Sequence, residues 1–139
     1  MKRTGRRPTL GAVVRPARGA AVVEMAVVAP LLLMIVFGII EFGWVFMVRQ
    51  TMVTAAREGA RVAALQGTSE GDISTRVSDY MQPAGLTSYT LSVTRATQQD
   101  PTETVQITIP YSQITLLGEF FGPTNFNITA TSSMRKEGA

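Results

Sequence analysis

The sequence predicts an α+β protein with a long N-terminal transmembrane helix that extends into a soluble part, a short second helix and a small three-stranded antiparallel sheet. Three observations carry this prediction. A membrane-length apolar segment follows a basic N-terminus, a later stretch repeats apolar residues with helical spacing, and three further stretches alternate apolar and polar residues. We expect three parts: a basic leader at residues 1–19, the long helix at 20–66, and a small α+β domain at 67–139.

Positive charge is concentrated at the N-terminus. Six of the thirteen basic residues fall within positions 1–19, which contain no acid, so the remainder has seven basic against ten acidic residues and a net charge of −3. A basic arm beside an apolar run is typical of the cytoplasmic flank of a membrane helix. We therefore expect a single-pass membrane protein with a cytoplasmic N-terminus, a periplasmic or extracellular C-terminal domain and no nucleic-acid partner.

The apolar run is long enough to cross a bilayer. Sixteen uncharged residues extend from Met25 to Ile40, and the apolar character continues through Val48, whereas a bilayer core of ~30 Å needs about 20 residues. Because the run exceeds the apolar core of a cleaved secretory signal, we expect the helix to be retained. An aromatic and basic boundary, typical of a membrane interface, ends it: Trp44, Phe46 and Arg49.

Two carboxylates accompany this apolar run. Glu24 lies five residues after Gly19, and Glu41 follows seventeen residues later. A charge at the bilayer centre costs about 2.5–3.5 kcal/mol on insertion scales, so such a residue normally has a partner or a role. Glu24 either pairs with a positive charge or extends to the headgroups. Glu41, about 25 Å further along a helix, either pairs with Arg49 of a neighbouring chain or is solvated.

Helical pattern continues beyond the membrane segment into an alanine-rich stretch. Small residues spaced four apart form two adjacent rows, which permit close approach of another backbone, although alanine also favours helix by propensity alone. The rows are Ala55, Gly59 and Ala63, and Ala56, Ala60 and Ala64. Arg57 and Arg61 share another face of this helix, where they repel mildly unless an acid lies opposite.

The remainder predicts one short helix and three strands. Gly67 ends the long helix, and Ser69–Asp72 resembles a capping box before an amphipathic helix that Pro83 stops. Period-two alternation predicts strands at 89–94, 105–111 and 126–132, with a hairpin between the first two. Residues 116–122 either plug the core or form an exposed contact loop.

The composition argues against an enzyme. The chain has no cysteine and no histidine, so disulfides, thiolate metal sites and histidine chemistry are excluded. No acid pair is apparent, and the two lysines, Lys2 and Lys136, lie near the termini. We expect no cofactor, no metal and no catalytic residue.

Residues 18–65 resemble the TadE-like family of pseudopilins from tight-adherence (Flp-type) type IV pilus systems. Met25 departs from the pattern, since the family often has an aromatic residue there, and so does Trp44, where a basic residue is common. An ordered set of motif positions carries the resemblance: Arg18-Gly19, Val23-Glu24, Pro30, Gly38, Glu41, Phe42-Gly43, Arg49-Gln50, and Ala55, Ala56, Arg57, Glu58, Gly59, Ala60 and Arg61.

The resemblance implies a pilin-like, non-enzymatic minor pseudopilin that acts in pilus assembly and surface adherence. A prepilin peptidase would cut between Gly19 and Ala20, with Arg18, Glu24 and Met25 as recognition positions. The Glu24 carboxylate would then pair with the new amino group of its own or a neighbouring chain.

The same resemblance implies partners in the bacterial cytoplasmic membrane: the peptidase, the pilus assembly machinery, and other pilin or pseudopilin subunits that pack against the motif positions from Pro30 to Arg61. The alternative is an uncleaved single-pass accessory or anchor protein with a small exported domain.

Overall fold

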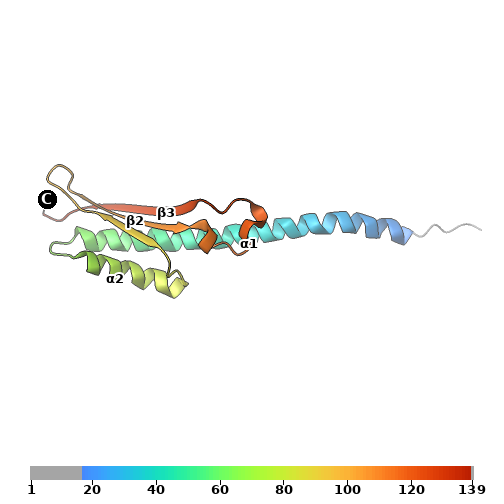
Figure 1. The fold of residues 1–139 in the computed structure, drawn as a ribbon, viewed down its shortest axis with the longest axis horizontal. Helices are drawn as coiled ribbons and strands as arrows, with labels where there is room; N and C mark the ends of the chain where they lie inside the picture. The colour runs from blue at the N-terminus through green and yellow to red at the C-terminus, as the bar shows by residue number, and fades with distance from the viewer. Residues whose placement is uncertain (1–16, 139) are drawn as a thin grey trace, which may run out of the picture. The chain divides into compact units, whose positions relative to one another are not determined.

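The computed structural model describes residues 17–138 (Figure 1). The predicted leader covers residues 1–19, and its residues 1–16 lie outside the described part of the chain. Contacts divide the chain into two units, Met1–Ile35 and Val36–Ala139. The predicted fold class is confirmed, with the elements in the order α1 (Ala17–Ala64), α2 (Glu70–Met81), β1 (Thr90–Thr94), β2 (Thr102–Pro110) and β3 (Asn127–Arg135).

α1 supplies the apolar segment. Its 48 residues include Pro30, and the helix continues through this proline without a break. It is long and apolar enough to cross a membrane, and none of its most apolar window is buried inside the protein. The helix ends two residues before the predicted boundary at 66, and Gly67 then adopts the left-handed φ of +76° that glycine accommodates without strain.

α2 forms as the sequence predicts. The Ser69 hydroxyl accepts a hydrogen bond from the backbone N–H of Asp72, and the Asp72 carboxylate accepts one from the backbone N–H of Ser69, which completes the capping box. The buried face consists of Ile73, Val77 and Met81. A 3₁₀ turn containing Pro83 follows directly, because proline cannot continue the helical hydrogen bonds.

The three strands form one antiparallel sheet in the order β1-β2-β3. Leu91 lies opposite Ile107, and Ile107 lies opposite Ala130, so the apolar positions of all three strands share one face. The other face is polar, where Thr104 and Ser133 hydrogen-bond across the strands at 2.8 Å. The sheet therefore has one face to cover, as the alternation predicts.

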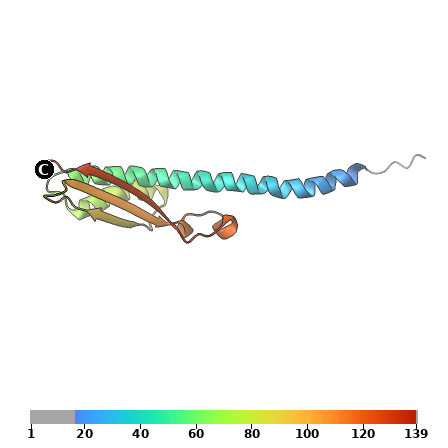
Figure 2. The same ribbon diagram turned by 90° about the horizontal axis from the view of Figure 1, so that it is seen from above.

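The second unit buries its core between this sheet face and two helices. Figure 2 shows α2 behind the sheet, beside the C-terminal part of α1. A Cβ placed on Gly59 of α1 would lie 2.8 Å from Val77 of α2 and 3.2 Å from Val105 of β2, so the three elements meet at that glycine. Fully buried side chains surround the meeting point: Met52, Ala55, Ala56, Ala60, Ala63, Ile73, Val77, Met81, Val105 and Ile107.

Candidate functional site

The two acidic residues in the apolar segment of α1, Glu24 and Glu41, have opposite environments. Glu41 is buried in the second unit with only 5% of its surface exposed. Glu24 is exposed on the first unit, and among residues 17–138 no hydrogen bond or ion pair holds its side chain. The structure therefore gives different surroundings to two glutamates that look chemically alike in the sequence.

Donors from the loop after β2 satisfy the Glu41 carboxylate: the hydroxyls of Tyr111 and Thr115 and two backbone N–H groups. Its Oε1 accepts a hydrogen bond from the Tyr111 hydroxyl at 2.7 Å. Its Oε2 accepts hydrogen bonds from the backbone N–H groups of Leu116 at 3.0 Å and Leu117 at 3.2 Å. Hydrogen bonds to an ionised acceptor are among the stronger ones in proteins, which offsets the cost of burial. The two alternatives that the sequence left open, a neighbouring Arg49 and solvation, are both replaced by this contact within the chain.

Further contacts place the donor loop. Trp44, one turn of α1 beyond Glu41, donates its Nε1–H to the carbonyl oxygen of Ile114 at 2.6 Å. Burial, followed by the hydrogen bond to Glu41, raises the pKa of Tyr111 above its usual value, so the phenol stays protonated and continues to donate. The backbone at Leu116 and Leu117 thus covers Glu41, while the side chains of Leu116 and Phe120 stay more than half exposed.

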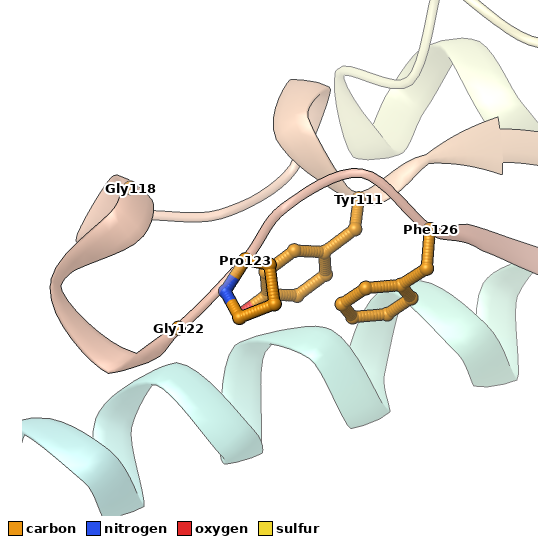
Figure 3. A pocket seen from close by; sticks show the side chains of 5 residues that line it. All are labelled: Tyr111, Gly118, Gly122, Pro123 and Phe126. Atoms are coloured by element: carbon orange, nitrogen blue, oxygen red, sulfur yellow. The ribbon is translucent and has the colours of Figure 1, made fainter.

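A small apolar hollow adjoins this loop. The rings of Tyr111 and Phe126 stack with centroids 4.5 Å apart, and the backbone N–H of Tyr111 donates to the carbonyl oxygen of Phe126 at 2.9 Å. Figure 3 shows both rings over α1, with Pro123 beside Tyr111. The hollow has a volume of about 280 Å³, and a neighbouring one of about 340 Å³ lies against Gly38, Glu41 and Phe42. Among the described residues that line the two hollows, Glu41 is the one with a charged side chain.

The predicted processing positions lie in the first turns of α1. Gly19 and Ala20 are exposed, and a Cβ on Gly19 would meet no atom within 4 Å. Met25 is also exposed, with 62% of its surface accessible. Arg18 belongs to the same first turn.

The predicted packing positions divide between solvent and core. Pro30 and Gly43 are exposed, whereas Gly38 is half-buried. Both small-residue rows point into the core of the second unit, where side chains of the chain's own α2 and β2 pack against Gly59. Arg57 is exposed, while Glu58 binds Arg61 at 3.0 Å and Arg76 of α2 at 3.1 Å.

One buried acid is absent from the sequence prediction. Glu103 of β2 is fully buried and binds Lys136 at 3.0 Å and Arg95 at 3.5 Å. The signal was present, because Glu103 shares the alternation that turns Val105 and Ile107 inward. The two cations come from the ends of β1 and β3, which the sheet brings together, and they neutralise the carboxylate. Among residues 17–138 no group of acidic side chains has the arrangement of a metal site.

Comparisons with known proteins agree with the recognition made from sequence. The model of the TadE-like protein family matches residues 19–61. No curated protein and no solved structure matches the chain. The match covers Gly19, Glu24 and Glu41, and it ends at Arg61, within the stretch of α1 that packs on α2 and β2. TadE-like proteins are structural or accessory rather than enzymatic, and the match points to a role in the Tad pilus system. Residues 19–61 are thus similar to the TadE-like family, which confirms the predicted resemblance over that segment.

Proposed function

We propose that this chain is a minor pseudopilin of a tight-adherence (Flp-type) pilus system. It is a non-enzymatic subunit that α1 holds in the bacterial cytoplasmic membrane, with its α+β domain on the outer side and its basic leader in the cytoplasm. The family match and the unburied apolar helix support this role. In this role, the chain takes part in pilus assembly and thereby in surface adherence.

The contrast between the two acids carries the proposal. Glu41 needs nothing from outside because its own domain supplies the donors. Glu24 has no such donors among residues 17–138, yet it begins an apolar helix in which a lone charge is costly. A positively charged group from outside the described chain would relieve that cost. The amino group that cleavage creates at Ala20, on a neighbouring subunit, has the required charge.

Cleavage between Gly19 and Ala20 fits the local structure. Gly19 lacks a side chain and lies near the start of α1, where terminal turns open most easily, so a protease can hold the backbone in an extended form. The leader removed in this way carries six positive charges, which hold it on the cytoplasmic side. We take Arg18, Glu24 and Met25 as the positions that a prepilin peptidase reads.

Mass spectrometry of the membrane-extracted protein tests this proposal. The chain is expressed with an active prepilin peptidase and, in parallel, with an inactive one. We expect a mature protein that begins at Ala20 only with the active peptidase. A Gly19→Leu variant should keep its leader, whereas the matched Gly43→Leu change, also at an exposed glycine of α1, should leave cleavage intact. An intact leader beside active peptidase, or normal cleavage of Gly19→Leu, would refute the assigned site.

Assembly is tested separately on processed protein. We expect Glu24→Gln to be cleaved but to be lost from pilus complexes, because the amide cannot neutralise an amino group. Glu119→Gln, at an exposed acid of the loop, serves as the control and should assemble normally. Normal assembly of Glu24→Gln would remove the role given to this carboxylate.

One observation favours the alternative of an uncleaved accessory protein. Both small-residue rows of α1 are buried in the chain's own domain, so that part of the helix has no small-residue surface left for neighbouring subunits. The mass measurement distinguishes the two functions, since an uncleaved anchor keeps residues 1–19 in every strain.

A further inference from the structure

Large apolar side chains gather around the loop that closes over Glu41. Phe42 is 73% exposed, Leu116 55%, Phe120 62% and Phe126 50%. We call these four residues the apolar rim. Phe42 and Phe126 line the same hollow, and the amide of Leu116 binds Glu41, so the rim lies where β2 ends and β3 begins. Exposed aromatic side chains that cluster in this way mark a contact surface.

Charge is distributed unevenly over the domain. The segment from 111 to 126 contains a single charged residue, Glu119, and no basic residue. The opposite end of the sheet carries charges of both signs: Arg95, Asp100, Glu103, Arg135, Lys136 and Glu137. The charged end of the sheet is therefore favourable in water, whereas the end with the apolar rim is favourable in apolar surroundings.

Chain length places the rim at a membrane surface. The 21 residues from 20 to 40 are enough to cross a bilayer core of ~30 Å, so Glu41 falls where the crossing ends. The hydrogen bonds from Leu116 and Leu117 hold the loop at the level of Glu41. Trp44 and Tyr111, the two aromatic residues with polar groups in this region, are of the kind enriched at membrane interfaces.

We propose that the apolar rim rests in the outer surface of the membrane, so that the domain lies against the lipid and does not stand away from it. The occupant is the lipid of the bilayer itself, because Phe42 of the rim belongs to α1, where its neighbours Ile39, Ile40 and Phe46 are apolar and exposed as well. The donors around Glu41 then have a second purpose, since they keep that carboxylate satisfied beside lipid. Contact of the apolar rim with lipid depends on apolar burial and not on anionic headgroups, because residues 111–126 include no basic residue.

This inference rests on the proposed placement of α1 in a membrane, but it does not require cleavage of the leader. The absence of cysteine from the chain permits clean single-site labelling. The full chain is reconstituted in phosphatidylcholine vesicles with a nitroxide on Leu116→Cys or Phe120→Cys. Leu32→Cys in the apolar helix and Gln98→Cys in the opposite loop are the two references. Collision with oxygen, which concentrates in lipid, is compared with collision with a water-soluble nickel complex.

We expect labels at 116 and 120 to resemble the label at 32, with nickel accessibility several-fold below that of the label at 98. Addition of anionic lipid should change none of these values. Water-exposed labels at 116 and 120, beside a lipid-exposed label at 32, would overturn the inference and leave the anchor standing. A water-exposed label at 32 would instead refute the anchor and this inference together. Protection from both reagents, with spin coupling between chains, would show that a second copy covers the rim and would overturn the lipid assignment.

Because the Leu116 side chain is exposed, its replacement should not disturb folding. Trp44 emission checks this point in every labelled variant, since the Trp44 indole binds the carbonyl oxygen of Ile114 in the same loop. Leu116→Cys also keeps the backbone N–H that binds Glu41.

Discussion

Replacement of Glu41 by alanine should destabilise the domain strongly, because it removes an acceptor shared by several donors. The two backbone N–H groups of Leu116 and Leu117 would lose their partner in a site where Glu41 is only 5% exposed. A buried donor without a partner costs about 1–3 kcal/mol, so two such groups cost roughly 2–6 kcal/mol in total. The Tyr111 hydroxyl is partly accessible and can turn to water, so it adds less. The loss is a large share of the ~5–15 kcal/mol that stabilises a typical domain.

Urea unfolding of the full chain in mild detergent measures this loss. Trp44 is the single tryptophan and lies against the affected loop, so its emission reports the transition. With an m-value of about 1–2 kcal/mol/M for ~100 residues, the midpoint should fall by roughly 2 M. Tyr111→Phe removes one donor and should cost only about 1 kcal/mol. Glu119→Gln, an exposed acid in the same loop, should stay within ~0.5 kcal/mol of the parent. An unchanged midpoint for Glu41→Ala, with unchanged hydrogen exchange at Leu116 and Leu117, would refute the reasoning.

Four further predictions concern the core and the capping box of α2. Gly59→Leu should destabilise the domain by about 3 kcal/mol or more, because even a Cβ there would lie 2.8 Å from Val77, whereas Gly43→Leu in open space should leave the urea midpoint nearly unchanged. Lys136→Met should lower the stability of the domain by about 1–3 kcal/mol, because Arg95 alone then faces the buried Glu103. The double variant with Glu103→Gln should recover part of that stability. Additive costs in the double-mutant cycle would argue against a coupled pair. Ser69→Ala should cost ~1 kcal/mol. Hydrogen bonds from the Ser69 hydroxyl and backbone lower the pKa of Asp72. The stabilising effect of the Asp72 carboxylate is therefore complete above its ordinary pKa and is lost as pH falls through the lower folded value. Asp72→Asn should make the melting temperature fall less steeply between about pH 5 and pH 2, and an unchanged pH dependence would contradict this.

Local patterns in the sequence predicted most of the fold. The capping box at Ser69 and the spacing of Ile73 and Val77 specify α2 through contacts within a few residues. Alternation in β2 assigns its inward face, because the sheet has one apolar layer to cover. The same alternation marks Glu103 as inward, but its neutralisation needs Lys136, which is 33 residues away in the chain. Periodicity identifies faces and does not identify partners.

The environment of Glu41 could not be predicted for the same reason. Its donors are main-chain N–H groups 75 and 76 residues further along the chain, and every residue except proline has such a group. The small-residue rows show a related gap, because the rows mark a packing face but do not identify what packs against it. The sequence suggested neighbouring subunits, whereas the structure places side chains of α2 and β2 of the same chain against Gly59.

Recognition of Glu41 through the main chain also leaves the side chains of Leu116 and Leu117 unspecified. Either position can change in size or polarity while its amide keeps the carboxylate. The loop can therefore acquire a different outward chemistry through single substitutions, at little expense to the scaffold beneath it. Related chains that work against different surfaces could diverge here first, with the glutamate itself held constant.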